Sequence, residues 1–177
     1  MGGFDKTMLK GASTTENALE LFDQLESVDM DYMIGKWKGF EFPTNHFLDG
    51  LLEASGWYGK AFYDQDKVHP LLFYKANKKG VFAINPGLLP IRLLRYPIPK
   101  NQLLRNSLLA AKLLLQTKKY KARLRMIEHR GKFSAAMIYD NQPIIDVFRK
   151  MDTNTVLGMM EMKGMKKPFF FVLKRNT

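Results

Sequence analysis

The last third of the chain carries a regular run of short extended segments, and this run constrains the fold more than any other feature. Five segments with strand character follow one another, at about 120–129, 132–140, 144–151, 155–162 and 168–175. Short turns containing Gly, Asn, Asp or Pro separate them. Strands joined by such short turns pair antiparallel. The sequence therefore predicts an antiparallel meander over residues 120–177.

Further strand-like segments precede the meander, over residues 31–87, and raise the predicted number of strands to about nine. That number is sufficient to close a barrel, which leaves no exposed sheet edge. A length of 177 residues fits one domain. We predict a mainly β fold, a single antiparallel barrel with a helical segment at residues 1–30 and a helical insertion near 88–119.

Several classes of site are excluded by residue types and motifs. The chain has no cysteine, which excludes disulfides, Cys-ligated zinc, iron–sulfur clusters and thiol catalysis. None of the three histidines has a second histidine or a carboxylate at metal-ligand spacing, so we expect no metal and no cofactor. The nucleophile and phosphate-binding motifs GxSxG, GxxxxGK[ST] and GxGxxG are missing. No secretory signal or membrane-spanning stretch is evident, so we predict a cytoplasmic protein.

The charge of the chain is concentrated in its middle. Residues 67–127 hold 14 basic side chains and no acidic one, within a net charge of +11. Such a block attracts anionic partners. Within it, segment 88–119 combines a broad leucine-rich face with a narrow basic stripe, which suits a helix that plugs one barrel end or one that lies on an anionic membrane surface. We disfavour nucleic acid, because the basic residues alternate with leucines rather than with exposed aromatic residues.

A GKWKG segment at residues 35–39 carries the most specific local pattern. In a strand, Gly35, Trp37 and Gly39 share one face. Glycine weakens a strand, so two glycines beside a tryptophan indicate a close approach by a backbone, a ring or a ligand. We favour a tryptophan that packs the floor of the barrel and keep direct ligand contact as the alternative.

The chain resembles the GXWXG-motif proteins, which join this segment to a C-terminal domain of uncharacterised function. The resemblance runs through GKWKG, PTNHFLDGLLEASGWYGKAF and HPLLF, and then through SAAMIYDNQPIIDVFRK, TVLGMMEMKG and PFFFVLKR. The GxW pattern is also similar to the first strand of lipocalins and other calycins. That similarity implies a calycin-like barrel in which a basic residue of the last strand, Lys174 or Arg175, covers the Trp37 ring.

Two carboxylates fall on faces that are otherwise apolar. Asp146 shares a strand face with Ile144 and Phe148, and Glu128 shares one with Leu124 and Met126. A charge inside a barrel must be paired or must contact a ligand, because an unpaired buried charge costs several kcal/mol. We expect an ion pair with an arginine, and Arg149, on the opposite face of the same strand as Asp146, is among the candidate residues. A general acid or base at Asp146 or Glu128 is the alternative.

The function that we predict is the binding of a small hydrophobic or amphiphilic anionic molecule, such as a fatty acid or a phospholipid, inside the barrel. An enzyme and a membrane-surface adaptor that uses segment 88–119 are the alternatives. The aromatic and methionine side chains expected to line the cavity are Trp37, Trp57, Tyr63, Phe73, Met126, Met137, Tyr139, Phe148 and Met160. The basic residues expected near the head group of the ligand are Arg92, Arg95 and Arg105.

Overall fold

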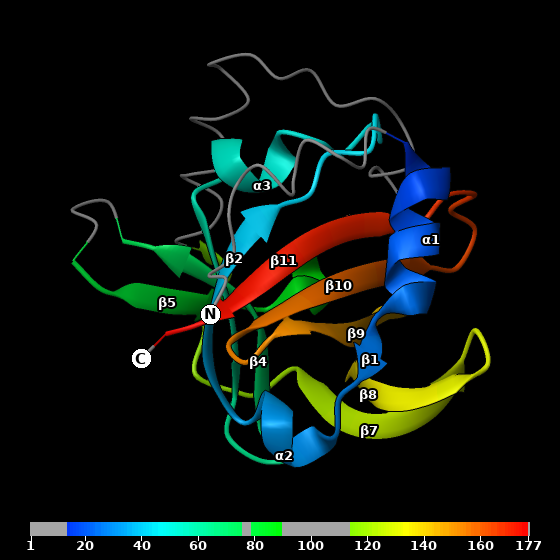
Figure 1. Cartoon of the computed structure of the whole chain (residues 1–177). Helices are drawn as coiled ribbons and strands as arrows, with labels where there is room; N and C mark the ends of the chain where they lie inside the picture. Colours follow the sequence, from blue (N-terminus) through cyan, green and yellow to red (C-terminus); the bar gives the residue numbers. More distant parts are fainter. Residues whose placement is uncertain (1–13, 76–78, 90–113, 177) are drawn as a thin grey trace.

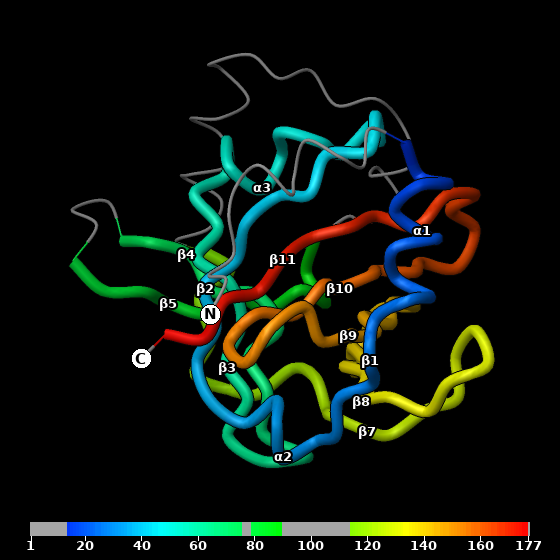
Figure 2. Tube along the Cα trace, viewed as in Figure 1, coloured from blue at the N-terminus to red at the C-terminus, as the bar shows by residue number. Residues whose placement is uncertain are grey.

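A computed structural model of the chain describes residues 14–75, 79–89 and 114–176. Eight antiparallel strands close into a barrel in the order β3-β2-β11-β10-β9-β8-β7-β4, and β4 pairs with β3 to complete it (Figures 1 and 2). The barrel strands are β2 (Gly35–Glu41), β3 (Trp57–Phe62), β4 (Val68–Tyr74), β7 (Ala122–His129), β8 (Lys132–Tyr139), β9 (Ile144–Asp152), β10 (Thr155–Met162) and β11 (Phe169–Arg175). The predicted meander and the single mainly β barrel are confirmed.

Three short strands extend this sheet. They are β1 (Glu26–Ser27), which pairs with β9, and β5 (Val81–Ile84) and β6 (Gln116–Thr117), which continue the sheet beyond β4. Most of the predicted insertion at 88–119 lies outside the described residues. At its end the structure differs from the prediction, because Gln116 and Thr117 pair with β5 and form a strand instead of a helix.

Helices lie around the barrel and define its two ends. Helix α2 (Met30–Met33) lies at the lower end in Figure 1, and α3 (Leu51–Ala54) lies at the upper end. Helix α1 (Thr15–Gln24) begins at the cap Thr14, whose side chain accepts a hydrogen bond from the Asn17 amide. Its buried residues Ala18 and Phe22 pack on the outer face of strands β8 to β11. A short 3₁₀ helix, η2 (Pro86–Leu88), follows β5.

Strand alternation divides the buried side chains between two cores. The core of the barrel interior contains inward residues of all eight strands, among them Trp37, Phe62, Leu124 and Phe148. The second core lies outside the barrel, between its wall and α1, and contains Phe22 and Phe170. Helix α1 therefore braces the outer wall of the barrel and covers neither of its ends.

Candidate functional site

The lower end of the barrel is closed by the tryptophan of the GKWKG segment. Trp37 is completely buried, and its indole N–H donates a hydrogen bond to the Met33 carbonyl in α2 at 2.8 Å. The Arg175 guanidinium lies 4.3 Å from the centroid of the indole ring. It also donates to the Ile34 carbonyl at 2.7 Å and to the Tyr32 carbonyl at 2.5 Å. The structure therefore places Trp37 as a plug that the last strand covers through Arg175.

The two glycines of the segment are explained by packing. Gly35 has φ +128°, a backbone conformation that residues with a Cβ rarely adopt. A Cβ on Gly39 would lie 2.0 to 2.6 Å from three carbons on the benzene side of the Trp57 indole. The space beside Trp37 is therefore filled by a second tryptophan, and the Trp57 ring packs directly against the backbone of Gly39.

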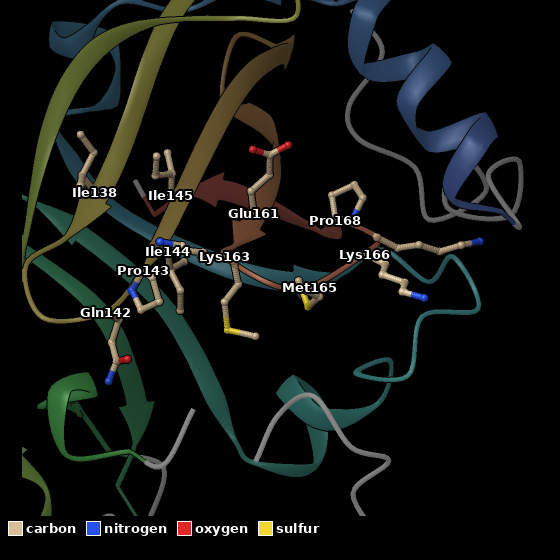
Figure 3. A pocket seen from close by; sticks show the side chains of 12 residues that line it. Ile138, Gln142, Pro143, Ile144, Ile145, Glu161, Lys163, Met165, Lys166 and Pro168 are labelled. Atoms are coloured by element: carbon tan, nitrogen blue, oxygen red, sulfur yellow. The ribbon is translucent and has the colours of Figure 1, made fainter. Parts of the chain in front are cut away.

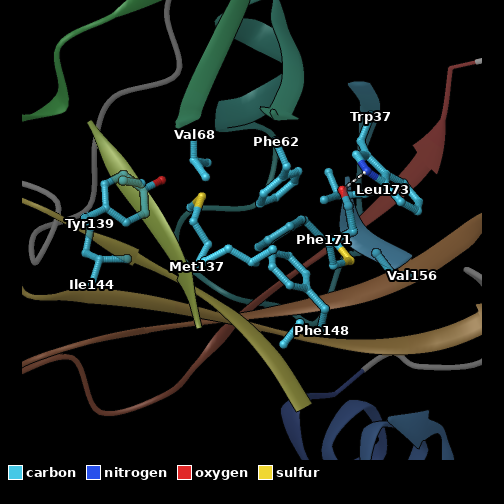
Figure 4. Close-up of a cluster of buried hydrophobic side chains, with 14 of the residues drawn as sticks. Trp37, Phe62, Val68, Met137, Tyr139, Ile144, Phe148, Val156, Phe171 and Leu173 are labelled. Atoms are coloured by element: carbon cyan, nitrogen blue, oxygen red, sulfur yellow. Dashed lines mark hydrogen bonds between the residues drawn. The ribbon is translucent and has the colours of Figure 1, made fainter. Parts of the chain in front are cut away.

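The barrel interior near its middle is filled by its own rings. Phe62 and Phe148 meet edge to face with centroids 5.7 Å apart, and Phe148 contacts Phe171 at 6.4 Å (Figure 4). Met137, completely buried, packs in the same cluster. Eight-stranded barrels have an interior just wide enough for such filling or for one small ligand.

An ion pair interrupts this apolar interior. The Lys60 ammonium lies 2.7 Å from Asp146 Oδ2, and the two side chains are 3% and 1% exposed. Lys60 also donates to the Pro70 carbonyl at 3.1 Å. Three rings surround its Nζ, with centroids at 4.9 Å for Phe171 and 5.7 Å for both Trp57 and Tyr139.

Burial controls the protonation of this group. Loss of water raises the pKa of the Asp146 carboxyl and lowers the pKa of the Lys60 ammonium, and in both cases the attraction between the two charges opposes the effect. Burial, with the charge of Asp146 added, raises the pKa of the Tyr139 phenol well above 10. Tyr139 therefore stays neutral beside the pair.

Three buried polar atoms near the pair have no hydrogen-bond partner among the described residues. They are the two carboxylate oxygens of Asp146, which are acceptors, and Trp57 Nε1, which is a donor. Oδ2 is the oxygen in ion-pair contact with Lys60, so Oδ1 is the oxygen that can accept from another group. The Trp57 side that packs on Gly39 is the benzene side, so the N–H is on the opposite side of the indole. Buried polar groups in folded proteins are nearly always satisfied, so the Asp146 carboxylate and the Trp57 N–H are groups that can still bind a polar partner.

The inward direction of Lys60 results from a bulge at Gly59. The pairing of β3 with β4 shifts register on both sides of Gly59, whose φ is +142°. Strict alternation would place Trp57 and Lys60 on opposite faces, whereas one extra residue places both inside. The Trp37 carbonyl lies 2.0 Å from where a Cβ on Gly59 would be, so only glycine fits. Sequence reasoning missed Lys60, although a glycine inside a strand is a signal for a bulge.

A groove of about 540 Å³ opens at the rim of the barrel, between the β8–β9 turn and the β10–β11 loop (Figure 3). Its apolar lining is Ile138, Pro143, Ile144, Ile145, Met162, Met165 and Pro168. Its polar lining is Gln142, Glu161, Lys163, Lys166 and Lys167. Ile144 and Met162 belong also to the interior core, so the floor of the groove is the top layer of that core.

The structure brings most of the sequence-predicted lining residues together. The residues that it places in the interior core, or packed against it, are Trp37, Trp57, Phe73, Met137, Tyr139, Phe148 and Met160. Tyr63 and Met126 lie at the surface instead, 57% and 40% exposed. Tyr63 follows the last residue of β3, and Met126 lies in the part of β7 whose side chains reach solvent. Arg92, Arg95 and Arg105 lie outside the described residues.

The prediction of an arginine partner for the buried carboxylate is wrong for Asp146. Asp146 is paired with Lys60, whereas Arg149 points to the opposite side of β9. There its guanidinium lies 4.9 Å from the centre of the Phe22 ring and donates to the His129 carbonyl. Glu128 is exposed. The buried setting that an acid or base requires is therefore present at Asp146 and absent at Glu128.

Two other kinds of feature are absent from the described residues. No group of three or more His, Cys, Asp or Glu side chains in that part of the chain is arranged to hold a metal ion. Nor does any helix there have the length and apolar character needed to cross a bilayer.

Comparisons with known proteins assign the family. Residues 20–78 match the model described as GXWXG protein, and residues 120–175 match the model described as Domain of unknown function (DUF4334). A crystal structure of a protein from Thermomonospora curvata is 32% identical and has a TM-score of 0.71, over 97% of this chain and 95% of that one. Among curated proteins, no relative is found by sequence. The chain therefore belongs to the GXWXG family that carries a C-terminal domain of unknown function.

Proposed function

We propose that this protein binds a small amphiphilic molecule with an anionic head group, such as a fatty acid or a phospholipid, at the rim groove. The observation that carries the proposal is the combination of an apolar floor, made by residues such as Ile144, Ile145 and Met162, with lysines at the edge. A volume of about 540 Å³ is within the range of ligand pockets, roughly 300–1,000 Å³. We extend the proposal to a cytoplasmic carrier without enzymatic activity.

The charges around the groove favour an anion. Lys163, Lys166 and Lys167 line it, against a single acidic residue, Glu161. Lys167 lies 3.3 Å from Glu16 of α1, but both side chains are more than half exposed, so water screens that pair. An anionic head group at the edge would meet a net positive field while its chain covers the isoleucines and methionines.

The test is a fluorescence titration with a fluorescent medium-chain fatty acid and with its methyl ester. We expect the acid to bind more tightly than the ester. Lys166→Glu should weaken binding of the acid about three- to tenfold and leave the ester unchanged, because it reverses one surface charge. Lys174→Glu is the matched control, since Lys174 is exposed near the opposite end of β11.

Two results would contradict the proposal. One is equal affinity for the acid and the ester, which would remove the role of the lysines. The other is equal weakening by Lys166→Glu and Lys174→Glu, which would show a general effect of net charge instead of a site.

A further inference from the structure

The polar cluster inside the barrel is separate from the rim groove, and its hydrogen bonding is incomplete. Lys60 and Asp146 neutralise each other at 2.7 Å. Asp146 Oδ1 still lacks a donor among the described residues, and Trp57 Nε1 lacks an acceptor. Lys60 Nζ is close to both side chains. It lies 2.7 Å from Asp146 Oδ2 and 5.7 Å from the centroid of the Trp57 ring.

A partner that binds both Asp146 and Trp57 must be neutral. A second anion would be repelled by the Asp146 carboxylate, and a second cation would be repelled by the Lys60 ammonium, in an interior where charge interactions are weakly screened. A hydroxyl group both donates and accepts a hydrogen bond, so it supplies what Asp146 Oδ1 and Trp57 Nε1 each lack.

The apolar side chains around the cluster indicate what the rest of the ligand is made of. Phe171, Tyr139 and Ile144 are buried around the cluster, and Met160 is directly opposite Asp146 in the β9–β10 pairing. Apolar side chains favour an aliphatic body, and methionines repack readily around an inserted chain.

An entry route follows from strand geometry. Ile144 is two residues before Asp146 on the same face of β9, a step of about 7 Å along the strand. Because Ile144 and Met162 form both the floor of the rim groove and the top of the core, displacement of these two side chains would connect the groove to the cluster.

We propose that Lys60, Asp146 and Trp57 form an interior binding site for the hydroxyl group of a small aliphatic alcohol. This site is additional to the rim groove and needs no anionic head group. The ligand hydroxyl donates to Asp146 Oδ1 and accepts from the Trp57 indole N–H, while its chain extends toward the rim groove along the route that displacement of Ile144 and Met162 opens.

The two tryptophans provide a direct test by ¹H–¹⁵N NMR. The indole N–H of Trp37 is already bonded to the Met33 carbonyl, whereas that of Trp57 has no described partner. We expect 1-octanol to shift the Trp57 indole signal, assigned with Trp57→Phe, and to leave the Trp37 signal in place. Nonane, which matches octanol in size without a hydroxyl group, should bind at least about tenfold more weakly, because it forms neither of the two hydrogen bonds.

Variants separate this site from the groove and from general unfolding. The double variant Lys60→Met/Asp146→Val keeps the interior filled without charges and should lose the preference for octanol. Lys166→Glu should leave the octanol response unchanged, so failure of the groove proposal and failure of this one are distinguishable. Three results would overturn the inference: no shift of the Trp57 signal, equal responses to octanol and nonane, or a Trp57 N–H bonded to an ordered water that octanol does not displace.

Discussion

Replacing Lys60 by methionine gives the most informative perturbation of this protein. The variant keeps a long side chain in the barrel but removes the only ammonium group described beside Asp146, which is itself completely buried. Breaking a buried pair by removing one partner costs about 3–5 kcal/mol. Because both side chains are at most 3% exposed, little of that cost is screened by water. The loss is a large fraction of the 5–15 kcal/mol typical of a domain.

The pH dependence of Lys60→Met has a defined sign. Burial raises the pKa of Asp146 in the folded state above its ordinary value of 3.8, and the variant lacks the cation that opposes this effect. Between the two pKa values the folded protein binds more protons than the unfolded one, so the free energy of unfolding falls as pH rises. We therefore expect the deficit relative to wild type to be smallest below the unfolded pKa and to grow as pH rises through the folded pKa of Asp146.

Urea unfolding followed by circular dichroism, at a series of pH values, measures both effects. Lys38→Met is the matched control, because Lys38 is exposed on β2, and it should change stability by less than about 0.5 kcal/mol. The double variant Lys60→Met/Asp146→Val should recover most of the loss, since apolar residues can replace a buried ion pair at little cost. A double variant as unstable as Lys60→Met would refute the reasoning, because the unpaired carboxylate would then not be the cause.

Three further changes test the packing of the barrel by the same unfolding measurement. Gly39→Ala should lower the free energy of unfolding by about 1–3 kcal/mol, because the new Cβ collides with the Trp57 ring. Adding Trp57→Leu should relieve part of that cost. Additive losses in the double variant would argue against the collision. Arg175→Met should cost about 2–3 kcal/mol through two lost hydrogen bonds and the uncovered Trp37 ring, and an unchanged midpoint would contradict the role of Arg175 as the cover. Ser134→Ala should cost about 1–3 kcal/mol, because its buried hydroxyl bridges Val28, which follows β1, to Phe148 in β9. A stable variant would show that water replaces this hydroxyl.

The strands of the last third could be predicted within about two residues because each is short, bounded by turn residues and patterned with period two. The five predicted segments correspond to β7, β8, β9, β10 and β11. The glycines around Trp37 predicted its position at the barrel floor, and the similarity to the first strand of lipocalins implied a basic cover from the last strand, which is Arg175. The helical segment predicted at residues 1–30 contains a helix at Thr15–Gln24, and its residues 1–13 lie outside the described residues.

The tertiary structure alone decided which charges meet inside. Lys60 and Asp146 are 86 positions apart in the sequence, and their 2.7 Å contact depends on barrel closure and on a bulge at Gly59 that turns Lys60 inward. It also placed Tyr63 and Met126 at the surface, since a strand pattern defines two faces without saying where along its length the interior ends. Periodicity is a property of neighbours in the chain, and it determined the strands. Which side chains meet inside the barrel depends on the register between strands that are distant in the sequence, and only the folded structure fixes that register.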